Sequence, residues 1–428
     1  MTNQTGLQPA GFQGDHSTRA LLASRLNAAR REVVDLTKRL LAIPSENPPG
    51  DTRPLAAEIA SMLQSMPGIE VETHSCGDPI LNIVARIRGA APGRRIVFNG
   101  HLDTFPLGNA ASWTTAFSGQ ELDGRLYGLG VSDMKGGLAA SIFALQHLAA
   151  FRSKFAGEVV ATFAGDEETM GTLGTQFLLD KVPFARGDAM ISGDAGSPTV
   201  LRFGEKGMIW LKLTAKGKSS HAAHVHRGDS AIEKLIAVMQ ELSALRKYEA
   251  KIPQKVLDAI EEASDVSEAL SGTGESNVLR NVTITFGTFN GGRLSNLVAD
   301  HAEATADIRL PVNVTVAEIE AKINEIVGRY GDVTVDISRR YEASWTDPDH
   351  EVVQILKKNC HSVLGHRPVL NMRVGASDAR LYRAAGIPSV VCGLTPNNMG
   401  AADEHVAIEE LMALGEIFAL SAFDFLAT

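Results

Sequence analysis

The feature that most constrains the fold is a pattern of a short apolar run, a polar loop and a helix, which recurs along the first half of the chain. The stretch Val97–Phe105 is an apolar run that stops abruptly at Gly100-His101-Leu102-Asp103. Later apolar runs stop in the same way at residues 165–168 and 193–194, each time with glycine followed by acids. Alternation of buried strands with helices predicts a doubly wound, mostly parallel α/β sheet, whose chemistry lies at the carboxyl ends of the strands.

The pattern changes after Gly207, which indicates a second domain. The chain has 428 residues, more than one ordinary core accommodates. Its middle part reads strand, helix, strand, strand, helix, strand, the order of a ferredoxin-like α+β domain. We therefore expect three parts and, within the inserted domain, one polar segment of unknown role. They are a discontinuous α/β domain (18–207 plus 341–428), an inserted domain (208–340), a loose tail (1–17) and a polar excursion or extra helix (247–276).

Composition excludes several classes of partner. The chain carries 41 basic and 50 acidic residues, a net charge of −9, and has no basic cluster, which argues against nucleic acid and anionic membranes. No apolar run approaches membrane-spanning length, and the N-terminus lacks the apolar core of a signal peptide. The three cysteines are far apart and predict buried thiols in a reducing compartment. We expect a cytoplasmic protein.

One histidine and five acids are expected at strand ends or at the start of the following helix. They are His101, Asp103, Asp133, Glu167, Glu168 and Asp194. Histidine and carboxylate oxygens without cysteine suit Zn²⁺, Co²⁺ or Mn²⁺ in a hydrolytic site. Two adjacent buried acids repel each other unless a cation or a proton compensates them. Each acid alone is also explained by a helix cap or a solvated loop, but the set together favours a metal site.

The order of the motifs resembles one known family. The motifs are Ile-Pro-Ser-x-Asn-Pro-Pro-Gly (43–50), Gly-His-Leu-Asp-Thr (100–104), Gly-x-x-Asp-Met-Lys-Gly-Gly (130–137), Asp-Glu-Glu (166–168), Ser-Ser-His-Ala-Ala (219–223), Gly-Gly-Arg-x-x-Asn (291–296), Asp-Ile-Arg (307–309), Ala-Ser-Asp-Ala-Arg (376–380) and Asp-Glu-His-Val (403–406). Together they resemble the co-catalytic zinc aminoacylase and carboxypeptidase superfamily. This superfamily includes acetylornithine deacetylase, succinyl-diaminopimelate desuccinylase and glutamate carboxypeptidase.

The resemblance implies a metal centre with one or two zinc ions per subunit. His101 and Asp194 would bind one ion, Asp133 would bridge both, and Glu168 would bind the second. Asp103 would accept a hydrogen bond from His101 and fix its tautomer.

The resemblance also implies catalytic and substrate-binding residues. Glu167 would be the general base that takes a proton from metal-activated water. His221, in the inserted domain, would stabilise the oxyanion in the site of a partner subunit, so we expect a homodimer through that domain. Asn296 and Arg309 match positions that touch substrate, Ser377 and Arg380 are further candidates, and arginine suits a substrate carboxylate.

Two alternatives to these roles stay open. Arg309 is also explained by a structural ion pair with the nearby Asp307. The family carries a histidine ligand three residues before its final acid pair, and Gly400 stands at that position. His405 is either a substitute ligand or a loop residue. Because the usual histidine is missing, we expect the second metal to be held by fewer protein ligands, to be bound weakly or to be absent. Asp194 also replaces a more usual glutamate.

We therefore expect a metal-dependent amidohydrolase that removes the acyl group from an N-acyl amino acid or related small amide. One alternative is an exopeptidase or carboxypeptidase that uses the same site on short peptides. Another is a non-catalytic, weakly metallated relative, which the missing histidine suggests. Retention of both Glu167 and His221 argues against that last alternative, because a protein that only binds needs neither.

Overall fold

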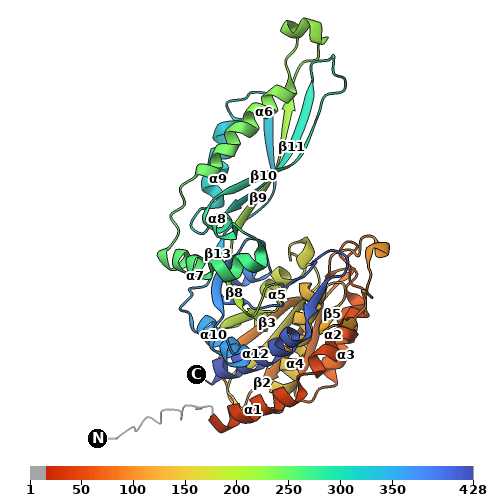
Figure 1. Ribbon diagram of the computed structural model, residues 1–428, viewed down its shortest axis with the longest axis vertical. Coiled ribbons are helices and arrows are strands. Elements are labelled where there is room, and N and C mark those ends of the chain that lie inside the picture. Colours follow the sequence, from red (N-terminus) through yellow and green to blue (C-terminus); the bar gives the residue numbers. More distant parts are fainter. Residues whose placement is uncertain (1–15, 428) are drawn as a thin grey trace, which may run out of the picture. The chain divides into compact units, whose positions relative to one another are not determined.

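The computed structural model describes residues 16–427 (Figure 1). The chain divides into two compact units, which are described separately. The first comprises the chain up to Arg202 with residues 346–369 and 377–428, and the second comprises residues 203–345 and 370–376. Most of the tail predicted for residues 1–17 lies outside the described residues, whereas His16 and Ser17 begin a helix. The domain bounds 18–207 plus 341–428 and 208–340, and the dimerisation expected of the inserted domain, stay predictions.

The first unit is built on a sheet in which β1, β2, β6, β3, β7 and β15 lie side by side in this order. Strands β6, β3, β7 and β15 run parallel, and β1 and β2 are antiparallel at one edge. The bounds of these strands are β1 Glu70–Gly77, β2 Ile80–Arg88, β3 Arg95–His101, β6 Glu158–Ala164, β7 Ala189–Ser192 and β15 Ser389–Val391. Strand β8 (Val200–Glu205) begins in the first unit, where it pairs with β15, and ends in the second, where β13 (Ser344–Trp345) and β14 (Val369–Arg373) pair with it. The predicted α/β fold is confirmed.

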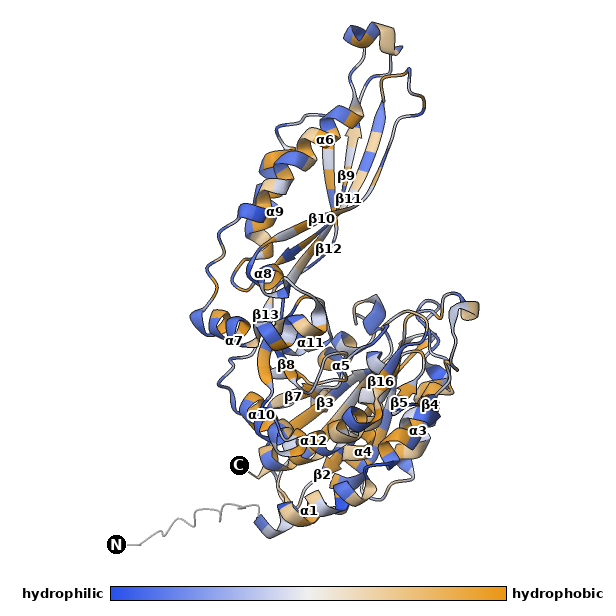
Figure 2. Ribbon diagram, in the orientation of Figure 1, coloured by the Kyte–Doolittle hydropathy of each residue, from blue (hydrophilic) through white to orange (hydrophobic). Residues whose placement is uncertain are grey.

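Helices cover both faces of this sheet because neighbouring side chains of a strand point to opposite faces. Phe98 of β3 stacks on Phe418 of α12 (Ile408–Leu426), with ring centroids 5.3 Å apart. The preceding residue, Val97, belongs to a buried cluster with Leu178 of α5 (Thr175–Lys181) and Tyr382 of α11 (Ala379–Ala384). Helix α4 (Gly136–Ala150) packs against α12, and both are largely apolar, as expected of helices buried within a domain (Figure 2).

The remaining helices of this unit are α1 (His16–Ala29), α2 (Glu32–Leu41), α3 (Arg53–Gln64) and α10 (Glu351–Leu364). The apolar spacing predicted one helix from Thr18 to Ala42, and the structure divides it at Arg30 and Arg31. Neither residue breaks helices, and Arg30 instead forms an ion pair with Glu409 of α12. A small antiparallel sheet, β16-β5-β4, was not predicted, because its strands are three residues long (β4 Gln120–Leu122, β5 Arg125–Tyr127, β16 His405–Ala407).

The second unit is an antiparallel sheet of strand order β10-β11-β9-β12 packed against two helices. Its elements follow the chain as β9 (Gly207–Lys216), α6 (Ala231–Leu242), β10 (Thr283–Gly291), β11 (His301–Leu310), α9 (Val316–Val327) and β12 (Val333–Tyr341). This is the expected ferredoxin-like order. Alternate residues of β9, such as Leu211 and Leu213, are buried in a cluster with Leu235 of α6 and Ile319 of α9.

The polar segment expected at 247–276 forms two helices, α7 (Gln254–Ser271) and α8 (Glu275–Arg280). Val256 and Ile260, one turn apart, are buried on α7. The Nζ atom of Lys206 donates hydrogen bonds to the carbonyl oxygens of Val278 and Asn281 at the end of α8. Among the described residues, no helix is long and apolar enough to cross a membrane.

Candidate active site

The site is built where three neighbouring parallel strands end. His101 is the last residue of β3, Glu167 and Glu168 follow β6, and Asp194 follows β7. The order β6-β3-β7 places these ends side by side at one edge of the sheet. Asp133 lies just before the first residue of α4. The strand ends predicted from the sequence therefore do lie together.

The tautomer of His101 is set by its own main chain. Its Nδ1 atom lies 2.8 Å from the carbonyl oxygen of Asp103, which only accepts hydrogen bonds, so Nδ1 carries a proton. In the neutral ring, Nε2 is then an unprotonated acceptor, and it lies 3.0 Å from Oδ1 of Asp133. Two acceptor atoms as close as Nε2 and Oδ1 repel each other unless a proton or a cation lies between them. Burial opposes protonation of the ring, but the contacts with Asp103 and Asp133 raise the pKa of His101 well above its usual value.

This geometry fits a divalent cation. One ligand atom each from His101, Asp133 and Asp194 lie within 4.8 Å of one another, and these residues are 1%, 7% and 2% exposed. Imidazole and carboxylate donors suit Zn²⁺, Co²⁺ and Mn²⁺. The predicted metal ligands His101, Asp133 and Asp194 are thus brought together in one buried cluster.

The acid pair supports the same interpretation. Oε1 of Glu168 is buried without a hydrogen-bond partner. Burial raises the pKa of Glu168 to about 9, and the negative charge of Asp133 adds to this effect. Burial also raises the pKa of Glu167 well above its usual value, against the opposing influence of His101. Clustered carboxylates with raised pKa values are typical of sites whose charge a bound cation neutralises.

The contacts of Asp103 differ from the predicted ones in one detail. The acceptor that orients His101 is the main-chain carbonyl oxygen, whereas the nearest carboxylate oxygen of Asp103 lies 3.5 Å from Nδ1. The carboxylate instead accepts hydrogen bonds from the backbone N–H groups of Glu167 and Glu168, at 3.1 and 3.0 Å. It therefore holds the loop of the acid pair, since strand β6 lies next to β3.

Two further residues position the site and were not singled out from the sequence. The amide of Asn47 donates to Oδ2 of Asp103 at 2.9 Å. The buried carboxylate of Glu404 accepts from the N–H groups of Gly130 and Ser132 and from the Ser132 hydroxyl, which holds the turn before Asp133. Both lie within motifs of the family resemblance, but their partners are distant in sequence.

The position of the missing histidine lies in a tight loop. Gly400 has a φ of +69°, a conformation that favours glycine. His405 packs its ring on Tyr127, with centroids 4.8 Å apart, and its Nδ1 lies 2.9 Å from the carbonyl oxygen of Asp403. Among the described residues, the metal-binding cluster does not include His405.

The predicted substrate residues have varied surroundings. Arg380 is 5% exposed, and its guanidinium donates to the carbonyl oxygens of Ser377 and Met170, at 2.7 and 2.6 Å. Arg309, in the second unit, makes a two-bond ion pair with Asp307, at 2.7 and 2.9 Å. This ion pair is the structural alternative that the sequence left open for Arg309.

His221 and Asn296 lie on paired, exposed loops of the second unit. The N–H of Ala222 donates to the carbonyl oxygen of Asn296, and His221 bridges to Leu297. Nδ1 of His221 accepts from the N–H of Ala223, so the neutral ring carries its proton on Nε2 and presents a donor.

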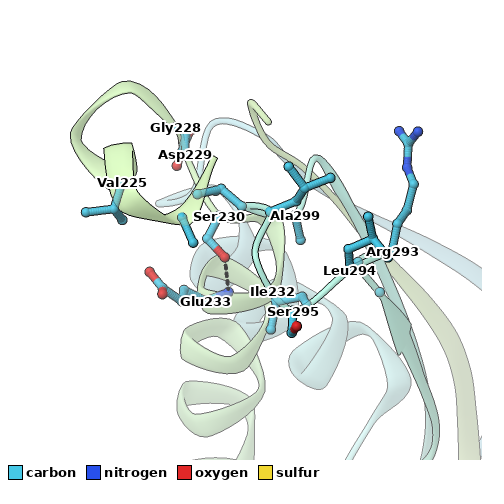
Figure 3. Close-up of a pocket in the computed structure, with 15 residues that line it drawn as sticks. Val225, Gly228, Asp229, Ser230, Ile232, Glu233, Arg293, Leu294, Ser295 and Ala299 are labelled. Carbon is cyan, nitrogen blue, oxygen red and sulfur yellow. Dashed lines mark hydrogen bonds between the residues drawn. The ribbon is translucent and has the colours of Figure 1, made fainter. Parts of the chain in front are cut away.

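A pocket of about 770 Å³ adjoins these loops. Figure 3 shows Ser230 and Glu233 at the start of α6 on one side and Leu294 and Ser295 on the other. The hydroxyl of Ser230 accepts from the N–H of Glu233 and caps the helix.

Comparison with known proteins agrees with this fold and chemistry. The model of peptidase family M20/M25/M40 matches residues 97–423. Succinyl-diaminopimelate desuccinylase from Methylorubrum populi is 30% identical over 79% of this chain and 84% of its own. The enzyme of that name from Cereibacter sphaeroides is 29% identical over 92% of this chain and 99% of its own. An M20 family metallo-carboxypeptidase from Sulfolobus solfataricus has a similar structure, with a TM-score of 0.75 at 18% identity, covering 92% of this chain and 99% of its own.

The protein is a metal-dependent hydrolase of amide bonds. It belongs to peptidase family M20/M25/M40, and the resemblance found from the sequence motifs is confirmed.

Proposed function

We propose that this protein is a zinc-dependent deacylase that removes the acyl group from an N-acyl amino acid. The observation that carries the proposal is the pair of facing acceptors, Nε2 of His101 and Oδ1 of Asp133, in one buried cluster with Asp194. Succinyl-diaminopimelate desuccinylases are among its relatives, which favours a dicarboxylic acyl group such as succinyl.

The residues that would hold the metal are His101, Asp133 and Asp194, with Glu168 at the edge of the cluster. A divalent cation there supplies Lewis acidity, which polarises an amide carbonyl and acidifies water. His101 offers Nε2 because its Nδ1 proton is bonded to the Asp103 carbonyl oxygen. Asp133 is held in place by the turn that Glu404 fixes.

Glu167 moves the proton in this proposal. Its carboxylate accepts a proton from the attacking water and delivers it to the leaving nitrogen, so that the amine departs neutral. The loop that carries it is held at its start by the carboxylate of Asp103, which fixes the position of the base.

His221 and Asn296 complete the proposal from a second copy of the chain. His221 is exposed, and the hydrogen bond accepted by its Nδ1 atom leaves the ring proton on Nε2. This proton can be donated in a hydrogen bond to an oxyanion. We propose a homodimer formed by the second units. Because Arg309 is engaged by Asp307, we assign it a structural role.

The test is a substrate screen with metal-free protein reloaded with Zn²⁺, Co²⁺ or Mn²⁺. The panel contains N-succinyl-diaminopimelate, N-succinyl and N-acetyl amino acids, dipeptides and tripeptides, and the readout is release of the free amine. We expect hydrolysis of N-acyl compounds that requires added metal. Cleavage of peptides alone would favour an exopeptidase, and no hydrolysis with any of the three cations would overturn the proposal.

A further inference from the structure

We propose that Arg380 is a positioning residue that holds the end of the loop of the acid pair, and that it does not bind substrate. This loop, residues 165–171, is called the acid loop below. The inference rests on the proposed role of Glu167 as general base, since the acid loop carries it.

The acid loop turns back sharply after the acid pair. Met170 has a φ of +86° and Gly171 one of +71°. The left-handed region is unfavourable for a residue with a side chain, so Met170 needs outside contacts to keep this conformation. Its carbonyl oxygen accepts a hydrogen bond of 2.6 Å from Nη2 of Arg380.

The other end of the guanidinium is fixed as well. Nη1 of Arg380 donates to the carbonyl oxygen of Ser377 at 2.7 Å, so the planar group spans two backbone segments. With 5% of the residue exposed, the guanidinium is enclosed between these segments. A fork of donors suits such a bridge, whereas lysine offers one charged point.

Asp378 lies against the end of the acid loop and is itself held by the helix that follows it. Its Oδ2 accepts a hydrogen bond of 2.6 Å from the hydroxyl of Thr175, at the start of α5. Its Oδ1 lies 2.4 Å from where a Cβ atom at Gly171 would stand, so the loop and this carboxylate are in close contact. The segment from Ser377 to Arg380 therefore packs against the end of the acid loop.

The first part of the acid loop is held by the carboxylate of Asp103, which accepts hydrogen bonds from the N–H groups of Glu167 and Glu168. The acid loop is thus held by Asp103 at the acid pair and by Arg380 at Met170. Small displacements of a catalytic group cost large factors in rate, which is why a contact at the end of the loop matters to the reaction.

The kinetic test compares Arg380→Ala, Arg380→Lys and a control, Arg383→Ala, on the N-acyl compound that the wild type hydrolyses fastest. Arg383 lies on the same helix and also donates to a backbone carbonyl oxygen, that of Ser389, away from the loop. We expect kcat of Arg380→Ala to fall by about 10- to 100-fold with KM nearly unchanged. Arg380→Lys should recover part of the loss, and Arg383→Ala should match the wild type. A rise in KM at unchanged kcat would show that Arg380 binds substrate and would overturn the proposal.

A second measurement does not depend on turnover. Hydrogen–deuterium exchange of the full-length variants follows the backbone amides of residues 165–173. We expect faster exchange in this segment for Arg380→Ala, with the rest of the chain unchanged, and wild-type exchange for Arg383→Ala. Wild-type exchange of this segment in Arg380→Ala would refute the contact even if no substrate were found. Faster exchange in an inactive protein would instead leave the contact supported and the proposed function refuted.

Discussion

A histidine whose tautomer is fixed by its own backbone belongs to the candidate metal site. The Asp103 carbonyl oxygen binds the Nδ1 proton of His101 and leaves Nε2 directed at Asp133. The raised pKa values of Glu167 and Glu168 follow from burying acids beside this cluster. A divalent cation held by His101, Asp133 and Asp194 would compensate the carboxylates and would accept the lone pair that Nε2 of His101 presents.

The first prediction concerns metal affinity. His101→Ala should weaken zinc binding by more than about 10- to 100-fold, the loss that removal of an outer partner of a metal ligand causes. The matched control is His405→Ala, a histidine packed on Tyr127 outside the cluster, which should keep wild-type affinity. Titration calorimetry with metal-free protein measures both. Loss of metal in His405→Ala would identify it as a substitute ligand.

The second prediction concerns the oxyanion. His221→Ala should lower kcat by about 10²- to 10³-fold, as removal of one oxyanion donor does. Metal content should not change, because His221 is outside the cluster. His226→Ala, an exposed histidine of the same loop, is the control and should retain activity. Equal kcat in both variants would remove His221 from the mechanism.

The residue types of the site could be predicted from the sequence, but their partners could not. Acids after apolar runs indicated where His101, Glu167 and Asp194 gather, because parallel strands share one edge. The partners of Arg380 and Glu404 depend on distances between segments far apart in the chain. Arg380 and Met170 are 210 positions apart, and no spacing rule connects them.

At the scale of elements, the buried lysine that is bonded to the end of α8 makes the free energy of unfolding depend on pH. Lys206 is fully buried and bonded to the carbonyl oxygens of Val278 and Asn281. Burial lowers the pKa of Lys206 to about 7, and the charge of Arg309 adds to this effect. In the unfolded chain its pKa is near 10.4.

The third prediction follows from that difference. Between about pH 7 and pH 10.4 the unfolded state binds more protons, so Lys206 makes stability rise with pH, by up to about 1.4 kcal/mol per pH unit. Urea unfolding of Lys206→Met should lack this slope relative to the wild type. Lys234→Met is the control, because bonds with Asp229 and Asp332 raise the pKa of Lys234 and keep it protonated across this range. Parallel profiles of wild type and Lys206→Met would contradict the prediction.

Most elements could be predicted because apolar periodicity reports burial directly. Strands β3, β6 and β7 end where the sequence pattern expects polar residues to follow, and the second unit has the expected order of strands and helices. The division of α1 from α2 could not be predicted, because helices accommodate arginine well, and the strands β4, β5 and β16 could not, because three residues are too few to show a period.

At the scale of the whole molecule, the second unit offers a face for self-association. Strand β10 is an edge of its sheet, and edge strands present unpaired backbone groups. Beside it, a groove of about 540 Å³ is lined by apolar residues that include Ile236, Met239, Phe286 and Phe289. Ile236 and Phe289 are 43% and 41% exposed.

The fourth prediction is that the double variant Ile236→Glu with Phe289→Glu is a monomer, whereas the wild type sediments as a dimer. Leu270→Glu changes an equally exposed apolar residue on α7 and should leave the dimer intact. Sedimentation velocity distinguishes these outcomes. A wild type that sediments as a monomer would exclude a contribution of His221 from a second copy.

We propose that Glu167 moves the proton in a site whose metal other residues would hold. The most direct test measures metal content and turnover together in Glu167→Gln. We expect zinc content equal to that of the wild type, with kcat lower by at least about 10²-fold, the contribution of a general base. Near-normal turnover in Glu167→Gln, with the metal in place, would contradict the account.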